Sequence, residues 1–220
     1  MYVDSDDEIE INACEEIYKI VSKEDYDIIN FGTKVISNDK TKFISWALST
    51  NRFNINSEFL LNEVINQRIS HNMWNKVFHR RIIDKLIENI SDIQIMNAED
   101  MLQCLIAFYF AKSYKVIQKP LYIYYADIGV SNKNTNEIDI TKYDYLCRST
   151  KIALDEFYNF LVKVKSNITY GFLFSKIYYN QYNYLFEKIK NNNEEYIKII
   201  EKYFDKSIIN QYLHLQKYNE

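Results

Sequence analysis

The first forty residues alternate between strand-like and helix-like patterns, and this order constrains the fold more than any other feature. Residues 2–3 are β-prone and are expected to end a short buried strand. Residues 11–24 carry apolar side chains at helical spacing. Residues 25–37 are again rich in strand-forming side chains, with Gly32 placed for a bulge. Strand, helix and strand in succession predict an α/β fold.

The rest of the chain divides into a mixed part and a helical part. Before residue 137 the patterns predict a helix from about Ser57, a helix within 71–90, a short strand over 91–96, a helix over 97–113 capped by Asn97, and two short strands over 114–127, the second beginning at Pro120. Beyond that point the chain has helix-like stretches with aromatic stripes. We therefore expect a first domain over 1–137 and a helical C-terminal extension over 138–220.

The composition limits the classes of function. The chain has Gly 3 and Pro 1 among 220 residues, and this scarcity of turn-forming residues favours long helices. The net charge of −3 provides no positive field for a phosphate backbone, so no nucleic-acid binding is expected. Cys14, Cys104 and Cys147 are far apart and odd in number, which is typical of free thiols in a reducing compartment.

Two further observations concern location. The N-terminal residues are acidic and do not resemble a signal peptide. The longest apolar stretch has about half of the ~20 residues that a membrane span needs. We expect a cytoplasmic protein without a transmembrane segment, and contact with the inner face of the membrane through the aromatic C-terminal helices is an additional interpretation.

Acidic side chains gather directly after the first predicted strand. Asp4, Asp6 and Asp7 leave a strand end, where open α/β sheets place their ligands. Carboxylates at this spacing can converge on one hard cation, and Mg²⁺ or Mn²⁺ prefers few carboxylates plus the phosphates of a ligand. The alternative interpretation is an acidic turn before a helix, stabilised by the helix dipole.

Two other places can carry chemistry. Glu99 and Asp100 begin a predicted helix after a strand, and an ionised carboxylate held there can accept a proton from a hydroxyl group. Ordinary first-turn acids are the alternative. Trp74 offers an indole that can stack on a ring face, and Lys76 offers an ammonium group that can meet a diphosphate. A core tryptophan beside a solvated basic face is the alternative for this pair.

Four segments, taken in order, resemble the family 2 glycosyltransferases, which have the GT-A fold. YVDSDDEIEINACEEIYKIVSKEDYDIINFG resembles the family's acidic metal motif followed by a helix and a strand. MWNKVFHRRII resembles its Trp-x-Lys segment, NAEDML resembles its Glu-Asp motif at a helix start, and KPLYIYYADIGVS resembles the strand pair that closes the catalytic domain. The resemblance covers Tyr2 to about Ser131 and implies a partial GT-A, Rossmann-like mixed sheet flanked by helices.

The resemblance implies a role for each candidate residue. These roles are metal binding by Asp4 and Asp6, with Ser5 between them and Asp7 in support; substrate binding by Asp4, Trp74, Lys76 and Glu99; and general base catalysis by Asp100. The cofactor would be a divalent metal, Mn²⁺ or Mg²⁺. The implied reaction is inverting transfer of a sugar from a nucleotide-diphosphate donor to a saccharide or lipid-linked acceptor, in polysaccharide or glycoconjugate synthesis.

One departure from the family pattern affects the expected activity. In the family a nucleotide-binding half precedes the acidic motif, whereas here the motif begins at Asp4. We therefore expect a chain that lacks this half, binds sugar nucleotides poorly and transfers little sugar by itself. The alternative function is a non-catalytic helical interaction protein, an inactive remnant of the same family.

Overall fold

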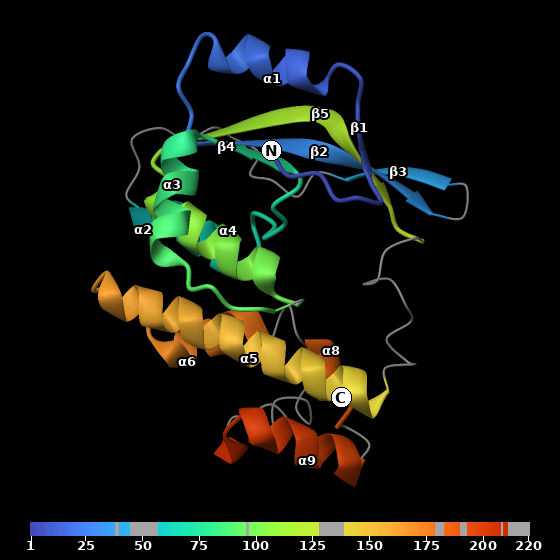
Figure 1. Ribbon diagram of the computed structural model, residues 1–220, viewed down its shortest axis with the longest axis vertical. Coiled ribbons are helices and arrows are strands. Elements are labelled where there is room, and N and C mark those ends of the chain that lie inside the picture. The colour runs from blue at the N-terminus through green and yellow to red at the C-terminus, as the bar shows by residue number, and fades with distance from the viewer. Residues whose placement is uncertain are drawn as a thin grey trace. The chain divides into compact units, whose positions relative to one another are not determined.

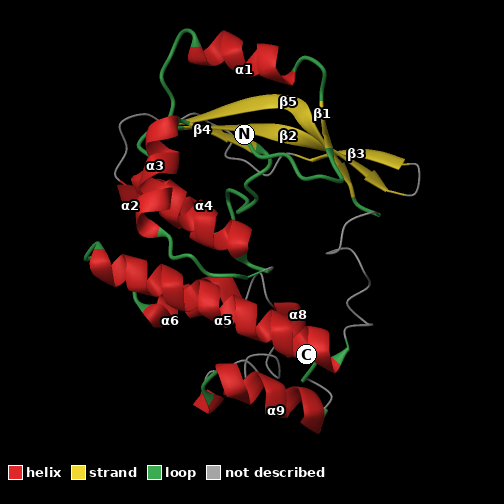
Figure 2. Cartoon of the chain, in the orientation of Figure 1, coloured by secondary structure: helices red, strands yellow, loops and turns green. Residues whose placement is uncertain are grey.

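The computed structural model describes residues 1–37, 40–44, 57–95, 97–127, 139–178, 183–189, 193–207 and 209–210. The chain divides into two compact units. The first comprises Met1–Ile90 and Gln103–Lys133, and the second comprises Ser91–Leu102 and Asn134–Glu220. Among the described residues, the strands belong to the first unit and the second unit is helical (Figure 1, Figure 2).

A mixed five-stranded sheet forms the centre of the first unit. Its strands are β1 (Glu8–Ile9), β2 (Ile28–Ser37), β3 (Lys40–Ile44), β4 (Lys76–Phe78) and β5 (Tyr114–Tyr125). Their order is β1-β5-β2-β3, and β4 also pairs with β2. The pair β2 and β5 is parallel, and the other pairings among these five strands are antiparallel. The predicted α/β fold with a mixed sheet flanked by helices is confirmed.

Helices lie on both sides of this sheet (Figure 1). α1 (Ala13–Val21) connects β1 to β2 on one side, and α2 (Ser57–Ile65) and α3 (Arg80–Asn89) lie on the other. Ala13 and Ile17 form the buried face of α1 and join an apolar cluster with side chains of β2 and β5. The helical spacing of apolar residues in this segment therefore predicted the helix.

The ladder between β2 and β5 is irregular on both sides of Gly32. Phe31 pairs with Ile117, Gly32 with Pro120 and Thr33 with Tyr122, so β5 has two extra residues before the Gly32 pair and one after it. Proline has no N–H group to donate to a ladder and is tolerated at such an irregularity. The irregularity predicted at Gly32 is present, although the extra residues lie on β5 and not on the strand of Gly32. The two short strands predicted over 114–127 are wrong, because this segment forms one continuous strand.

A polar side chain lies inside the core of the first unit. Asn30 is fully buried in β2. Its Nδ2 donates to the Asn75 carbonyl oxygen at 3.0 Å, and its Oδ1 accepts from the Tyr114 hydroxyl at 2.9 Å. Because both ends of the amide have partners, its burial does not leave an unsatisfied polar group. Asn30 thus links β2 to β5 and to the turn before β4.

Two predicted strands are absent, and three strands, β1, β3 and β4, were not predicted. Tyr2 and Val3 are exposed and outside any strand, and the first strand is instead β1, after the acidic residues. Residues 91–95 also form no strand. A run of two to five β-prone residues does not fix a strand without a neighbour to pair with. β3 and β4 are strands because each hydrogen bonds to β2, although their own sequences are polar or turn-like.

The second unit contains the start of α4 (Glu99–Phe110) and is built mainly on α5 and α9. Its helical segments are α5 (Ile140–Lys163), α6 (Tyr170–Leu173), a π-helical segment (Phe174–Tyr178), α8 (Asn183–Glu187) and α9 (Glu194–Tyr203). The Asp139 side chain caps α5 by accepting from the Lys142 N–H, and the buried Tyr143 donates its hydroxyl to the Leu185 carbonyl oxygen at 2.8 Å. In the part of the chain that the structure describes, no helix is both long and apolar enough to span a bilayer.

Candidate functional site

Residues 4–7 form a tight acidic turn that leads into β1. The turn is closed by the Asp7 N–H, which donates to the Asp4 carbonyl oxygen at 3.2 Å. The side chains of Asp4 and Asp6 are exposed, whereas Asp7 is half-buried. Because a strand separates this turn from α1, the dipole of that helix does not account for the acidic residues.

The hydroxyl of Tyr122 on β5 makes two hydrogen bonds to the acidic turn. This hydroxyl accepts a hydrogen bond from the Asp4 N–H at 3.1 Å and donates to Oδ2 of Asp7 at 2.9 Å. The Tyr125 N–H donates to the other carboxylate oxygen of Asp7, also at 2.9 Å. Burial raises the pKa of Asp7, and these hydrogen bonds oppose the rise. Burial likewise raises the pKa of Tyr122, so its hydroxyl remains a donor.

The residues of the turn divide into an anchor and two outward-facing acids. Asp7 is the anchor, since both of its oxygens accept hydrogen bonds from β5. Asp4 and Asp6 offer hard oxygen donors on the exposed side of the turn. Within the described residues, no group of three or more His, Cys, Asp or Glu side chains is arranged to hold a metal ion. Two carboxylates fit Mg²⁺ or Mn²⁺ that also binds phosphate, and do not fit an all-protein metal cage.

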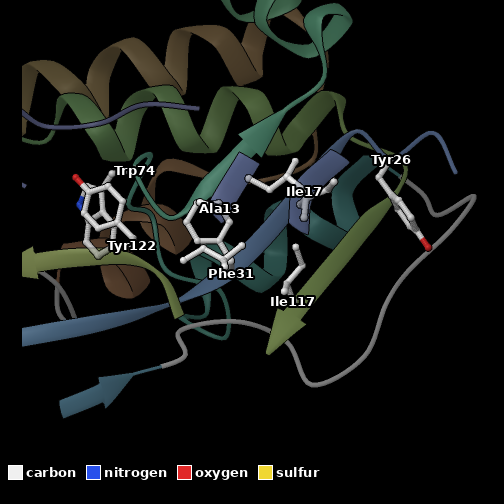
Figure 3. Close-up of a cluster of buried hydrophobic side chains, with 9 residues drawn as sticks. Ala13, Ile17, Tyr26, Phe31, Trp74, Ile117 and Tyr122 are labelled. Carbon is white, nitrogen blue, oxygen red and sulfur yellow. The ribbon is translucent and has the colours of Figure 1, made fainter. Parts of the chain in front are cut away.

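Trp74 belongs to the same aromatic group as Tyr122. Its indole stacks on the Tyr122 ring, with centroids 4.7 Å apart and an interplanar angle of 23° (Figure 3). It also stacks on Tyr124, at 5.5 Å and 5°. Trp74 is only 7% exposed and is part of the apolar cluster that includes Ala13 and Ile17. Trp74 is therefore a core residue in this structure, in line with the alternative interpretation.

Lys76 is the first residue of β4 and is fully buried. Its ammonium group donates to the Asn72 carbonyl oxygen at 2.5 Å, to Asn75 Oδ1 at 2.7 Å and to Ser70 Oγ at 3.3 Å. It also lies 5.9 Å from the centroid of the Phe108 ring. These contacts compensate for the burial of a charged group. These protein contacts support a role in the fold, and the expected contact with a diphosphate stays a prediction.

Glu99 and Asp100 begin α4 and belong to the second unit, whereas Asp4 and Asp6 belong to the first. Both side chains at the start of α4 are half-buried. Oε2 of Glu99 is buried, and among the described residues it has no hydrogen-bond partner. A buried carboxylate oxygen without a partner is costly, and such atoms in folded proteins call for a functional or structural reason.

The backbone before Glu99 is unusual. Ala98 has a φ of 70°, in the left-handed region, which costs an alanine roughly 1–2 kcal/mol. Asn97, which was predicted to cap the helix, instead donates its Nδ2 to Oγ1 of Thr150 at 3.0 Å. The prediction of Asn97 as the cap is therefore wrong, because α4 begins at Glu99, two residues later. Backbone strain of this kind is concentrated at functional sites.

The contribution of Tyr122 was not predicted from the sequence. It lies 115 residues from Asp7, and no local spacing relates the two positions. One signal was present: Tyr122 and Tyr124 are alternate residues of a strand pattern and must therefore share a face of the sheet. Asp4 and Trp74, which were both predicted as site residues, contact this same tyrosine, one through its N–H and the other through its ring.

No protein-family model and no curated protein sequence matches this chain. The comparison of structures shows that it has a glycosyltransferase fold.

The fold is shared with TarS, a glycosyltransferase of S. aureus, whose crystal structure comprises residues 1–349. The match has a TM-score of 0.55 at 12% identity and covers 91% of this chain and 55% of the TarS chain. For TarS in complex with UDP-GlcNAc, the TM-score is 0.60 at 14% identity, with 92% and 56% covered. This chain therefore spans about half the length of the TarS chains that it matches.

Proposed function

We propose that this chain carries part of a family 2, GT-A-type glycosyltransferase catalytic domain over residues 1–137, followed by a helical extension over 138–220. The observation that carries the proposal is the fold match to TarS in complex with UDP-GlcNAc, with a TM-score of 0.60 over 92% of this chain. The acidic turn at residues 4–7 supports it, because exposed carboxylates beside a sheet are suited to a dication that binds phosphate.

The donor in this proposal is a nucleotide-diphosphate sugar. Asp4 and Asp6 would hold Mn²⁺ or Mg²⁺, since their carboxylates are the hard oxygen ligands that these ions prefer. The bound dication would supply charge stabilisation for the departing diphosphate. Asp7 would support the site by anchoring the turn, because its two oxygens accept hydrogen bonds from Tyr122 and Tyr125.

The acceptor side of the reaction is assigned to the start of α4. Asp100 acts as the general base that takes the proton from the acceptor hydroxyl as its oxygen attacks the anomeric carbon, which gives inversion. Glu99 binds the acceptor through the accessible part of its half-buried side chain. The acceptor class is a saccharide or a lipid-linked saccharide.

The test is metal-dependent turnover of UDP-GlcNAc by the purified chain. We expect weak donor binding and a slow release of UDP that requires Mn²⁺. Asp6→Asn and Asp100→Asn should each lower this rate by about 10²-fold or more, as is typical for loss of a metal ligand or a general base. Asp92→Asn, which changes an exposed aspartate outside the site, should leave the rate unchanged.

One observation favours the second candidate, a non-catalytic protein of the same fold. Lys76 and Trp74, which the family resemblance places in the cleft, are buried and occupied by protein contacts. If UDP release is absent at high donor concentration, or persists in both Asp6→Asn and Asp100→Asn, the enzymatic proposal is wrong. The non-catalytic interpretation would then be the better one.

A further inference from the structure

We propose that Tyr122 is a positioning residue for the acidic turn and sets the affinity of that turn for a divalent cation. This inference rests on the proposed function, because it assumes that Asp4 and Asp6 hold the cation. Neither the sequence pattern nor the resemblance assigns a role to Tyr122. The structure places its hydroxyl where both ends of the turn meet.

The hydrogen bonds of this hydroxyl close the turn. Oη of Tyr122 accepts from the N–H of Asp4, the first residue of the turn, and donates to the carboxylate of Asp7, the last. A tyrosine hydroxyl has a single hydrogen to donate, so its one O–H is committed to Asp7. The backbone bond from Asp7 to Asp4 joins the same two residues. The residues between the two ends are Ser5 and Asp6, and the closed loop orders the backbone from which the Asp6 carboxylate projects.

The ring of Tyr122 is itself held firmly. The residue is fully buried, and its ring stacks on the indole of Trp74. Its backbone lies between two strands, with Ile9 opposite on β1 and Thr33 opposite on β2. A hydroxyl on a ring with so little freedom can pre-organise the groups that it binds. The loop would otherwise have to be ordered by the cation, at a cost in affinity.

Tyr122→Phe is a direct test, because phenylalanine keeps the ring in the stack and removes only the hydroxyl. We expect the dissociation constant for Mn²⁺, measured by electron paramagnetic resonance of the free ion, to rise about 10-fold, as found when groups behind a metal ligand are removed. The KM for UDP-GlcNAc in the presence of Mn²⁺ should rise by a similar factor. The kcat should change little, since Asp100 is untouched.

Tyr114→Phe is the matched control. Tyr114 is on the same strand, is fully buried and donates its hydroxyl to Asn30 at 2.9 Å. Removing that hydroxyl should lower the melting temperature about as much as Tyr122→Phe does, and it should leave Mn²⁺ binding unchanged. A second variant, Asp7→Asn, keeps the Tyr122 ring and removes its ionised acceptor, and it should also weaken Mn²⁺ binding.

The outcomes separate this inference from the proposed function. If the wild-type chain binds Mn²⁺ and Tyr122→Phe binds it equally well, Tyr122 does not position the turn, and the proposed function still stands. If Tyr122→Phe and Tyr114→Phe weaken Mn²⁺ binding to the same extent, the effect is one of general stability and the inference is wrong. If the wild-type chain does not bind Mn²⁺, both proposals are overturned.

Discussion

Arg81 of α3 donates its Nε–H to Oδ1 of the buried Asp27 at 2.6 Å, immediately before β2 begins. The other oxygen of Asp27 accepts from the backbone N–H groups of Lys112 and Ser113, at 2.7 Å and 3.0 Å. One carboxylate therefore joins the start of β2, the helix α3 and the segment that precedes β5. β2 in turn pairs with β5, the strand that carries Tyr122.

Asp27→Asn should destabilise the first unit by about 2–4 kcal/mol, because the variant removes the charge of a buried acceptor and turns one oxygen into a donor. Asp25→Asn is the matched control, since Asp25 also binds Arg81, at 2.6 Å, but is 66% exposed. Asp25→Asn should lower the unfolding free energy by less than about 1 kcal/mol. Urea unfolding followed by tryptophan fluorescence measures both. Equal losses of unfolding free energy in Asp27→Asn and Asp25→Asn would show that the buried hydrogen bonds of Asp27 do not stabilise these elements.

Lys76→Met tests whether Lys76 serves the fold or a ligand. The variant removes a buried donor from the Asn72 carbonyl oxygen, Asn75 Oδ1 and Ser70 Oγ, so a loss of about 2–4 kcal/mol in unfolding free energy is expected. Lys112→Met, at an exposed side chain, should cost less than about 0.5 kcal/mol. An unchanged stability combined with weaker binding of UDP-GlcNAc would instead identify Lys76 as a ligand-binding residue.

His71 should make stability depend on pH. Burial and the nearby charge of Lys76 lower the pKa of His71 from 6.5 to about 4 in the folded chain. The neutral imidazole is favoured on folding, so this contribution to stability is complete above pH 6.5 and is lost as the pH falls toward 4. The loss is at most about 3 kcal/mol, from roughly 1.4 kcal/mol per pH unit.

Unfolding free energies measured between pH 7 and pH 4 check this expectation. In His71→Gln the unfolding free energy should fall less steeply with decreasing pH, because residue 71 can no longer bind a proton. Parallel slopes in the wild-type chain and His71→Gln would contradict the assignment.

Gly32→Ala should destabilise the sheet at the irregularity between β2 and β5. A Cβ atom there would lie 2.5 Å from Cε2 of Phe43 and 3.1 Å from the Lys119 carbonyl oxygen. Phe43 is half-exposed and can move, whereas the carbonyl cannot move freely, so we expect a loss of about 1–3 kcal/mol. Gly171→Ala, where nothing lies within 4 Å, should be neutral or slightly stabilising in thermal unfolding. A neutral Gly32→Ala would show that β5 adjusts easily.

Local pattern was sufficient for some elements of the fold. The spacing of apolar residues predicted α1, β2 and α4, and the lone glycine of β2 predicted the position at which the ladder with β5 is irregular. Sequence pattern failed to predict strands whose formation depends on hydrogen bonding to a neighbouring strand. Tyr2 and Val3 are as β-prone as many strand residues, yet the chain forms its first strand at β1, where β5 offers partners.

The candidate site shows the same limit. The acids at residues 4–7 and at the start of α4 were recognised from the sequence and its family resemblance, because motifs are local. The partners of these acids were not recognised, since Tyr122 reaches Asp7 across 115 residues. The burial of Lys76 was also missed, because a basic residue in a polar segment gives no sign that three oxygens will surround its ammonium group.

The buried amide of Asn30 bears on how the chain avoids misfolding. Neighbouring side chains of a strand point in opposite directions, so sliding β2 by one position would turn Asn30 away from Tyr114 and Asn75. The displaced amide would then face apolar side chains with its hydrogen bonds unmade, at a cost of about 1–3 kcal/mol. Isoleucines alone would tolerate several alignments of the parallel pair, whereas this single asparagine penalises the wrong ones.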